Sequence, residues 1–180
     1  ELKTDGLEGE GPEYESIGLL GGSCAVNNLS AITKANYLCN ELGMDTIDMG
    51  GVIACAMELF EKGFLPEKDI GFKLNFGDAR ALIKLTKQTG LRQGFGDTLA
   101  EGGYRLAEKH GHPELFMGVK KQSFSAYEPR ALKGRGLGYV TSNRGACHMK
   151  GIMHFVELSD PTSIEGKPTI LKGLQNLMAV

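Results

Sequence analysis

The sequence predicts a mainly α, multihelical protein with glycine-rich irregular loops. Successive stretches carry apolar residues at helical spacing, and each stretch ends at a glycine, the usual helix terminator. Glycine supplies 26 of the 180 residues, about twice the average share of ~7%, without the repeat of collagen. Hydrophobic residues make up 41% of the chain, so a packed core is expected.

Three helices have clear ends. Each is preceded by an asparagine or aspartate that can accept hydrogen bonds from free helix amides, and each ends at a glycine. They are expected over residues 28–42, 46–62 and 78–90. The caps are Asn27 or Asn28, Asp45 and Asp78, and the glycines are Gly43, Gly63 and Gly90.

A fourth helix is expected over residues 97–111. Thr98, with Glu101 three residues later, matches a capping box. Gly102 and Gly103 inside this helix would each cost about 1 kcal/mol relative to alanine, so a close helix contact is expected there.

The helical period fades from Val119 onward. Phe124 and Tyr127 alternate with small polar residues, which is typical of a short extended piece after residue 120. Residues 134–138 (GRGLG) are expected to form a loop, and a last helix is expected over residues 169–179.

This change of character predicts two helical domains, residues 1–117 and 118–180. Residues 1–15 show no period and are expected to form an irregular lead-in. The chain starts with Glu1 rather than methionine, so the natural chain is expected to begin earlier or to have been cut.

Charge and composition exclude several classes of protein. The net charge is -2 and no basic stripe exists, so nucleic-acid binding has no support. No apolar run approaches the ~18 residues of a membrane helix, and no signal peptide is recognisable. The four cysteines form no C-x-x-C pair, which fits a reduced, cytoplasmic protein. Three of them lie among apolar or small residues and are interpreted as buried thiols.

The turn at residues 40–45 (NELGMD) joins the first two helices. Asp45 either only caps the second helix or also faces a ligand held at that N-terminus. Gly50 and Gly51 would let a large cofactor approach the backbone.

Residues 141–150 (TSNRGACHMK) concentrate chemically active groups. Arg144 and Lys150 favour an anionic ligand. Cys147 and His148 suggest a nucleophile or a metal ligand, but one of each is too few for a zinc site.

Glu13 and Glu15 flank Tyr14 in the lead-in. The simplest interpretation is a solvated acidic loop. If Glu15 lay near His148, the two side chains could handle protons, although more than a hundred residues separate them.

Six short motifs occur in order along the chain. They are residues 10–16 (EGPEYES), 38–47 (LCNELGMDTI), 56–63 (AMELFEKG), 94–102 (GFGDTLAEG), 126–130 (AYEPR) and 136–150 (GLGYVTSNRGACHMK). Each motif is weak alone, but in this order and spacing they resemble the aldehyde ferredoxin oxidoreductase family along essentially the whole chain.

The resemblance implies most of the second domain and the start of the third domain of a longer oxidoreductase. In this family tungsten, or molybdenum in relatives, is held by two pterin-dithiolenes whose phosphates share a magnesium ion. A small aldehyde would be oxidised to a carboxylic acid, and electrons would pass through a [4Fe-4S] cluster to ferredoxin. The cluster's cysteine ligands would lie before Glu1 and after Val180, so the missing N- and C-terminal parts are the expected partners.

The resemblance also assigns roles to residues. Glu15 and His148 fall on the catalytic glutamate and histidine near the metal. The cofactor-binding residues implied are Asn40, Asp45, Lys150 and Arg144, with Asn40 standing where the family pattern has an acid.

No metal ligand is expected in this chain. The place where some relatives hold an iron between two subunits with E-x-x-H reads Lys34 to Tyr37 here, and a homodimer is left open. This piece alone is not expected to be active. Two alternatives stay open: a non-catalytic helical subunit or truncated remnant that packs against a partner, and an unrelated phosphate-binding helical module.

Overall fold

The computed structural model describes residues 2–4 and 7–179. They divide into two compact units, Glu1–Met117 and Gly118–Val180. Most described residues are helical, and the strands among them form only two short two-stranded sheets. The predicted mainly α class is therefore confirmed.

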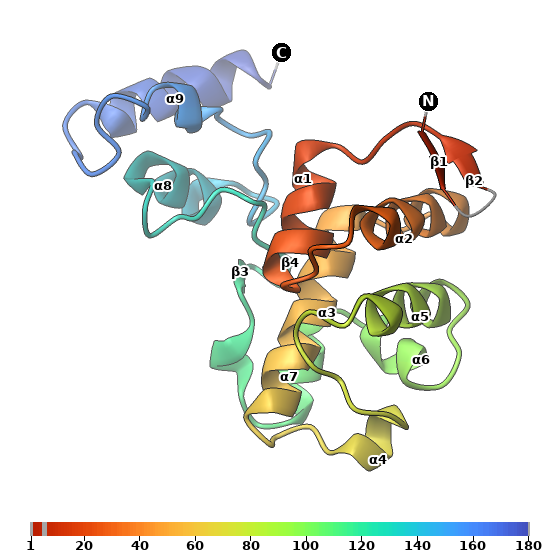
Figure 1. Ribbon diagram of the computed structural model, residues 1–180. Coiled ribbons are helices and arrows are strands. Elements are labelled where there is room, and N and C mark those ends of the chain that lie inside the picture. Colours follow the sequence, from red (N-terminus) through yellow and green to blue (C-terminus); the bar gives the residue numbers. More distant parts are fainter. Residues whose placement is uncertain (1, 5–6, 180) are drawn as a thin grey trace. The chain divides into compact units, whose positions relative to one another are not determined.

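The first unit is built around four helices: α2 (Leu29–Leu42), α3 (Thr46–Glu61), α5 (Ala79–Gly90) and α7 (Gly103–Lys109). Helix α2 packs on α5, while α3 packs on α7 and on the π-helix η1 (Ile17–Ser23) (Figure 1). Their apolar faces share one buried cluster, whose largest members include Leu20, Ile53, Met57, Leu59, Leu82 and Leu85. Burying such side chains stabilises each by roughly 1.5–3 kcal/mol.

The predicted caps of the first three helices are confirmed. Asn28 Oδ1 accepts from the Ala31 amide at 3.0 Å, and Asp45 Oδ1 accepts from the Asp48 amide at 2.8 Å. Asp78 accepts two first-turn amides of α5. Each cap satisfies amides that have no partner inside the helix.

The prediction of an irregular lead-in is wrong. Strands β1 (Leu2–Thr4) and β2 (Leu7–Gly9) pair in antiparallel fashion, and α1 (Tyr14–Ser16) follows and runs directly into η1. Two further short elements of this unit are α4 (Glu67–Ile70) and η2 (Pro113–Leu115).

The predicted fourth helix is two helices, α6 (Phe95–Leu99) and α7. Gly102 has φ of 93°, a left-handed conformation that ends the first helix and lets the second start. Gly94, rather than Thr98, precedes α6. A close contact is present at Gly103, because a Cβ there would lie 2.9 Å from the Phe116 ring and 3.6 Å from the Cα of Val52 in α3. The contact expected at Gly102 is absent, since nothing lies within 4 Å of its Cβ position.

Gly50 serves packing rather than cofactor access. A Cβ at Gly50 would lie 2.5 Å from the backbone carbonyl carbon of Leu19, so its absence is what lets η1 cross α3. The Cys24 thiol contacts the Gly50 carbonyl at 3.5 Å on the same crossing. The expectation that Gly50 leaves room for a large ligand is therefore wrong.

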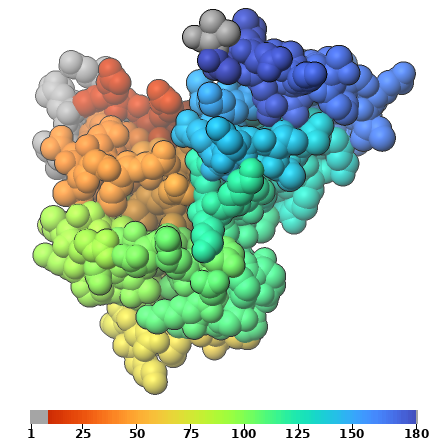
Figure 2. Space-filling view, turned by 180° about the vertical axis from the view of Figure 1, so that it is seen from behind, coloured from red at the N-terminus to blue at the C-terminus, as the bar shows by residue number. Residues whose placement is uncertain are grey.

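The second unit contains β3 (Gly118–Val119), β4 (Gln122–Ser123), α8 (Lys133–Thr141), η3 (Met153–Phe155) and α9 (Lys167–Leu177). The short hairpin β3–β4 is the extended piece expected after residue 120. Helix α9, the dark blue segment of Figures 1 and 2, starts two residues earlier than predicted and packs against α8.

The predicted loop at residues 134–138 lies inside α8 and is therefore wrong. The Glu157 carboxylate accepts the amides of Gly134 and Arg135 at 2.5 and 2.9 Å. A residue distant in sequence thus satisfies the helix start, and local glycine content does not reveal it.

Among the described residues, no helix has the length and apolar character needed to cross a membrane.

Candidate functional site

The turn at residues 40–45 places two polar side chains at the surface of the first unit. Gly43 adopts φ of 68° and ends α2, and Asp45 begins α3. The side chains of Asn40 and Asp45 are both exposed. The Asp45 carboxylate has a structural role as the cap of α3, and its exposure lets a ligand reach the same turn.

Glu15 is held beside this turn. Ser16 is buried, and its hydroxyl donates to Thr46 Oγ1 at 2.9 Å. Thr46 follows Asp45 directly, so this bond ties the short helix that carries Glu15 to the first turn of α3. Sequence reasoning missed Ser16 and Thr46, because nothing local pairs residues 30 positions apart.

The segment of residues 142–151 in the second unit carries the other predicted residues. Arg144 is exposed, while His148 and Lys150 are half-buried. Lys120 Nζ donates to the Ser142 carbonyl at 2.6 Å, which attaches the turn of the β3–β4 hairpin to the start of this segment.

Gly145 allows a second attachment of the same hairpin. It adopts φ of 102°, and a Cβ there would lie 2.4 Å from the Val119 carbonyl oxygen. Only glycine combines this backbone conformation with this close approach. The segment that carries Arg144 and His148 is therefore packed closely against β3.

Arg135 is the most deeply buried cation of the described chain, with 0% of its surface exposed. Its Nη1 donates to the carbonyl oxygens of His148 at 2.8 Å and Gly151 at 3.2 Å. Its Nη2 contacts Nδ1 of His154. Sequence analysis missed this residue because residues 134–138 were expected to form a surface loop.

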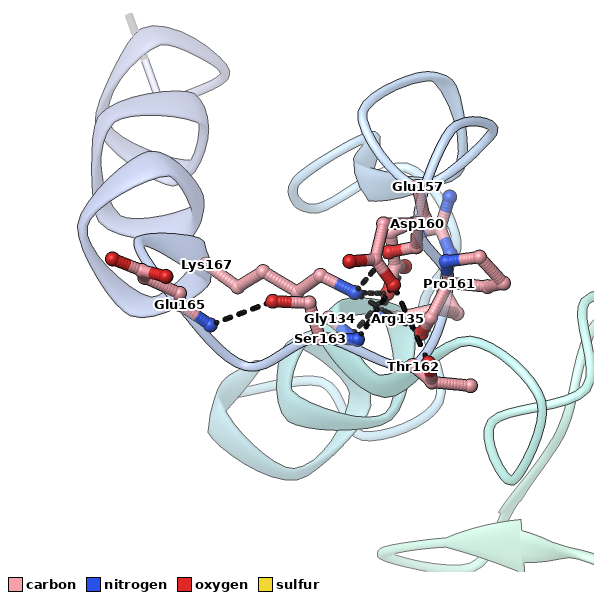
Figure 3. Close-up of polar contacts among 9 residues, drawn as sticks. All are labelled: Gly134, Arg135, Glu157, Asp160, Pro161, Thr162, Ser163, Glu165 and Lys167. Atoms are coloured by element: carbon pink, nitrogen blue, oxygen red, sulfur yellow. Dashed lines mark hydrogen bonds and ion pairs between the residues drawn. The ribbon is translucent and has the colours of Figure 1, made fainter.

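Lys167 and Glu157 form an ion pair with 7% and 0% side-chain exposure. Lys167 Nζ lies 2.8 Å from Glu157 Oε1 and also donates to the carbonyls of Asp160 and Pro161, each at 3.0 Å. Figure 3 shows Lys167 reaching from the start of α9 to the carboxylate that caps α8. Neither residue lies in a recognisable motif, so the sequence offered no signal for the pair.

His154 is held mainly in its neutral form. Burial lowers its pKa, and the neighbouring charges of Arg135 and His148 lower it further, against a smaller opposing effect of Glu157. The imidazole stacks on Tyr127 with 4.5 Å between ring centroids. A neutral imidazole accepts a hydrogen bond at one nitrogen, and this suits Nδ1 beside the guanidinium.

The four cysteines are free and buried, so the prediction of three buried thiols is confirmed. Burial raises the pKa of Cys24, Cys39 and Cys55 to about 12. These three thiols therefore stay protonated near neutral pH, and a protonated thiol is a poor nucleophile. Among the described residues, no group of three or more His, Cys, Asp or Glu side chains is arranged to hold a metal ion.

The predicted site residues thus fall into two groups. The first unit contains Glu15, Asn40 and Asp45. The hydrogen bond between Ser16 and Thr46, which are the chain neighbours of Glu15 and Asp45, holds those two residues near each other. The residues from 144 to 150 lie in the second unit on one segment.

Comparison with known proteins identifies the family. The family described as "Aldehyde ferredoxin oxidoreductase, domains 2 & 3" matches residues 1–180. The chain belongs to the aldehyde ferredoxin oxidoreductase family.

Curated relatives agree with this assignment. The tungsten-containing aldehyde ferredoxin oxidoreductase of Pyrococcus furiosus is 51% identical over 148 residues, which cover 81% of this chain and 24% of that protein. The enzyme of the same name from Thermococcus kodakarensis is 49% identical over 146 residues, 80% of this chain and 24% of that protein. The aliphatic sulfonate oxidoreductase, WOR-like subunit, of P. furiosus is 38% identical over 100 residues, 56% of this chain and 16% of that protein.

The chain therefore spans about a quarter of the length of these two tungsten-containing relatives, 24% of each. The names of these relatives specify tungsten. In the first unit, the 40–45 turn exposes an amide and a carboxylate, which suit a ligand with hydrogen-bonding groups. In the second unit, Arg144 and Lys150 are cations that suit an anionic ligand such as a phosphate.

Proposed function

We propose that this chain is part of a tungsten bis-pterin oxidoreductase that oxidises small aldehydes to carboxylic acids. Its 51% identity to a tungsten-containing aldehyde ferredoxin oxidoreductase across 81% of the chain carries the proposal. One aldehyde and one water give one carboxylic acid, two protons and two electrons. The electrons leave through a [4Fe-4S] cluster to ferredoxin. Residues 1–117 belong to the second domain of the family and residues 118–180 to the start of the third.

The cofactor supplies two-electron redox capacity and Lewis acidity when it is bound. Asn40 and Asp45 would hold one pterin at the turn between α2 and α3. Lys150 would contact a pterin from the second unit, and Arg144 would bind an anionic group of the cofactor. Tungsten is favoured over molybdenum because the relatives' names specify tungsten.

Two side chains act on the substrate. Glu15 accepts a proton from the attacking water or orients it, since a carboxylate near a reacting water is a suitable general base. His148 donates a hydrogen bond to the negative charge that develops on the aldehyde oxygen, a contribution that strengthens toward the transition state.

Substitution of Glu15 tests this proposal in the natural protein that carries this sequence. Glu15→Gln keeps the size of the side chain and removes the base, so we expect kcat to fall by a factor of about 100 or more with normal tungsten content. Glu13→Gln is the matched control, because Glu13 is an exposed carboxylate two residues away. Normal turnover of Glu15→Gln with full metal loading would remove the proposed role.

The other parts of the protein follow from the same proposal. Among the described residues no three candidate ligands converge on one point, so the proposal assigns the [4Fe-4S] ligands to the remainder of the natural polypeptide. Four free thiols also favour a reducing compartment, the cytoplasm.

A partner-packing role has its own support. The second unit exposes several large apolar side chains, between 62% and 82% of their surface: Val140, Phe155, Leu158, Ile164 and Leu177. Exposed apolar surface of this kind marks an interaction face. The rest of the same protein is the partner we favour. A stable, non-aggregating monomer of this 180-residue chain, with no affinity for the remainder of the protein, would instead support a separate non-catalytic subunit.

A further inference from the structure

We propose that Arg135 is a positioning residue that holds the segment of residues 148–151 and thereby aims His148 and Lys150. The inference rests on the proposed function, which gives those two side chains their roles. Arg135 itself is fully buried, so it does not contact substrate, and its Nη1 donates to backbone carbonyls.

The guanidinium holds both ends of the segment. One nitrogen, Nη1, donates to the His148 carbonyl at 2.8 Å and to the Gly151 carbonyl at 3.2 Å. The two residues between these anchors are Met149, which is exposed, and Lys150, which is half-buried. Fixing the two carbonyls restricts the backbone from which both predicted functional side chains project.

The second guanidinium nitrogen is fixed as well. Nη2 contacts His154 Nδ1, and the imidazole is stacked on Tyr127. The rings of Tyr127 and Tyr139 lie 5.2 and 5.7 Å from the guanidinium carbon, close enough for cation–π attraction. A planar guanidinium can donate in these two directions at once, whereas a lysine ammonium is a single point charge.

The main chain of Arg135 is also fixed. Its amide donates to Glu157 Oε2 at 2.9 Å, and Glu157 is paired with Lys167 (Figure 3). Buried charged groups therefore fix the position of the start of α8. The guanidinium of Arg135 in turn fixes the position of residues 148–151. Burying a charge is costly unless it is compensated, and the carbonyl, imidazole and aromatic contacts of the two terminal nitrogens offset part of that cost.

The test compares variants of the natural protein loaded with tungsten, with acetaldehyde as substrate. Arg135→Lys keeps the positive charge but cannot donate from two separate nitrogens to the backbone carbonyls and to His154. We expect kcat to fall about 10- to 100-fold, with KM for acetaldehyde and tungsten content unchanged. Arg130→Met is the matched control, because Arg130 is exposed and pairs with nearby Glu128, and it should keep wild-type kcat.

A double-mutant cycle separates positioning from a general structural effect. If Arg135 acts through His148, adding Arg135→Lys to His148→Gln should change kcat less than threefold. If the double variant loses kcat by the product of the two single-variant factors, the inference is overturned. It is also overturned if Arg135→Lys keeps wild-type kcat while His148→Gln is slow. Wild-type turnover of His148→Gln at full tungsten content would instead overturn the proposed role of His148 and the inference with it.

A second pair of variants applies if Arg135→Lys does not fold. His154→Leu removes the acceptor for Nη2, and His154→Asn restores a side-chain acceptor. We expect His154→Leu to lower kcat about fivefold or more and His154→Asn to recover most of it. Equal kcat for the two variants would contradict the proposal.

Discussion

Removing the positive charge of Lys167 should loosen the start of α8. Lys167→Met leaves the Glu157 carboxylate, with 0% side-chain exposure, without its ammonium partner. The variant also removes donors from the Asp160 and Pro161 carbonyls. Breaking a buried pair on one side typically destabilises by about 3–5 kcal/mol. Glu157 still accepts two backbone amides, so we expect the lower end of that range.

Hydrogen exchange of the α8 amides measures this effect directly. A loss of about 3 kcal/mol corresponds to at least about 100-fold faster exchange of the Gly134 and Arg135 amides. Lys172→Met is the matched control, since Lys172 is exposed on the same helix α9; surface changes of this kind stay within about 0.5 kcal/mol. Exchange of α8 within threefold of wild type in Lys167→Met would refute the reasoning.

Three further predictions follow from the contacts of the two units. Gly50→Ala should destabilise the first unit by about 1–3 kcal/mol, because the new Cβ meets the Leu19 backbone, while Gly22→Ala, with nothing within 4 Å, should not lower Tm. Asp45→Ala should cost about 1 kcal/mol in urea unfolding through the lost cap of α3, and Asp45→Asn should recover most of it. The pKa of His154 is lowered in the folded chain, so just below pH 6.5, the ordinary pKa of histidine, the unfolded chain binds more protons than the folded chain. The stability of the second unit should therefore fall as pH drops through that region, and His154→Leu should weaken this dependence.

Local signals in the sequence were sufficient for the first three long helices. Asn28, Asp45 and Asp78 each cap a helix through a side chain within three residues of the amide it satisfies. Such contacts depend on neighbours in sequence, so a pattern can reveal them. The division of the predicted fourth helix at Gly102 was not predicted, because the sequence does not show whether a glycine inside a helical pattern has a positive or a negative φ angle.

Non-local contacts explain what the sequence did not reveal. The first turn of helix α8 contains the amides of Gly134 and Arg135, which donate to Glu157, more than 20 residues away. The candidate site shows the same limit. The family resemblance pointed to Glu15 and His148, but Ser16 and Arg135, which fix their surroundings, are defined only by partners distant in sequence.

The position of tungsten in the natural protein tests the central claim most directly. Crystals of that protein, measured at the tungsten L edge, would locate the metal by anomalous scattering. We expect one tungsten peak flanked by the side chains of Glu15 and His148, with a pterin at the turn that ends at Asp45. A peak remote from these three side chains would contradict the account.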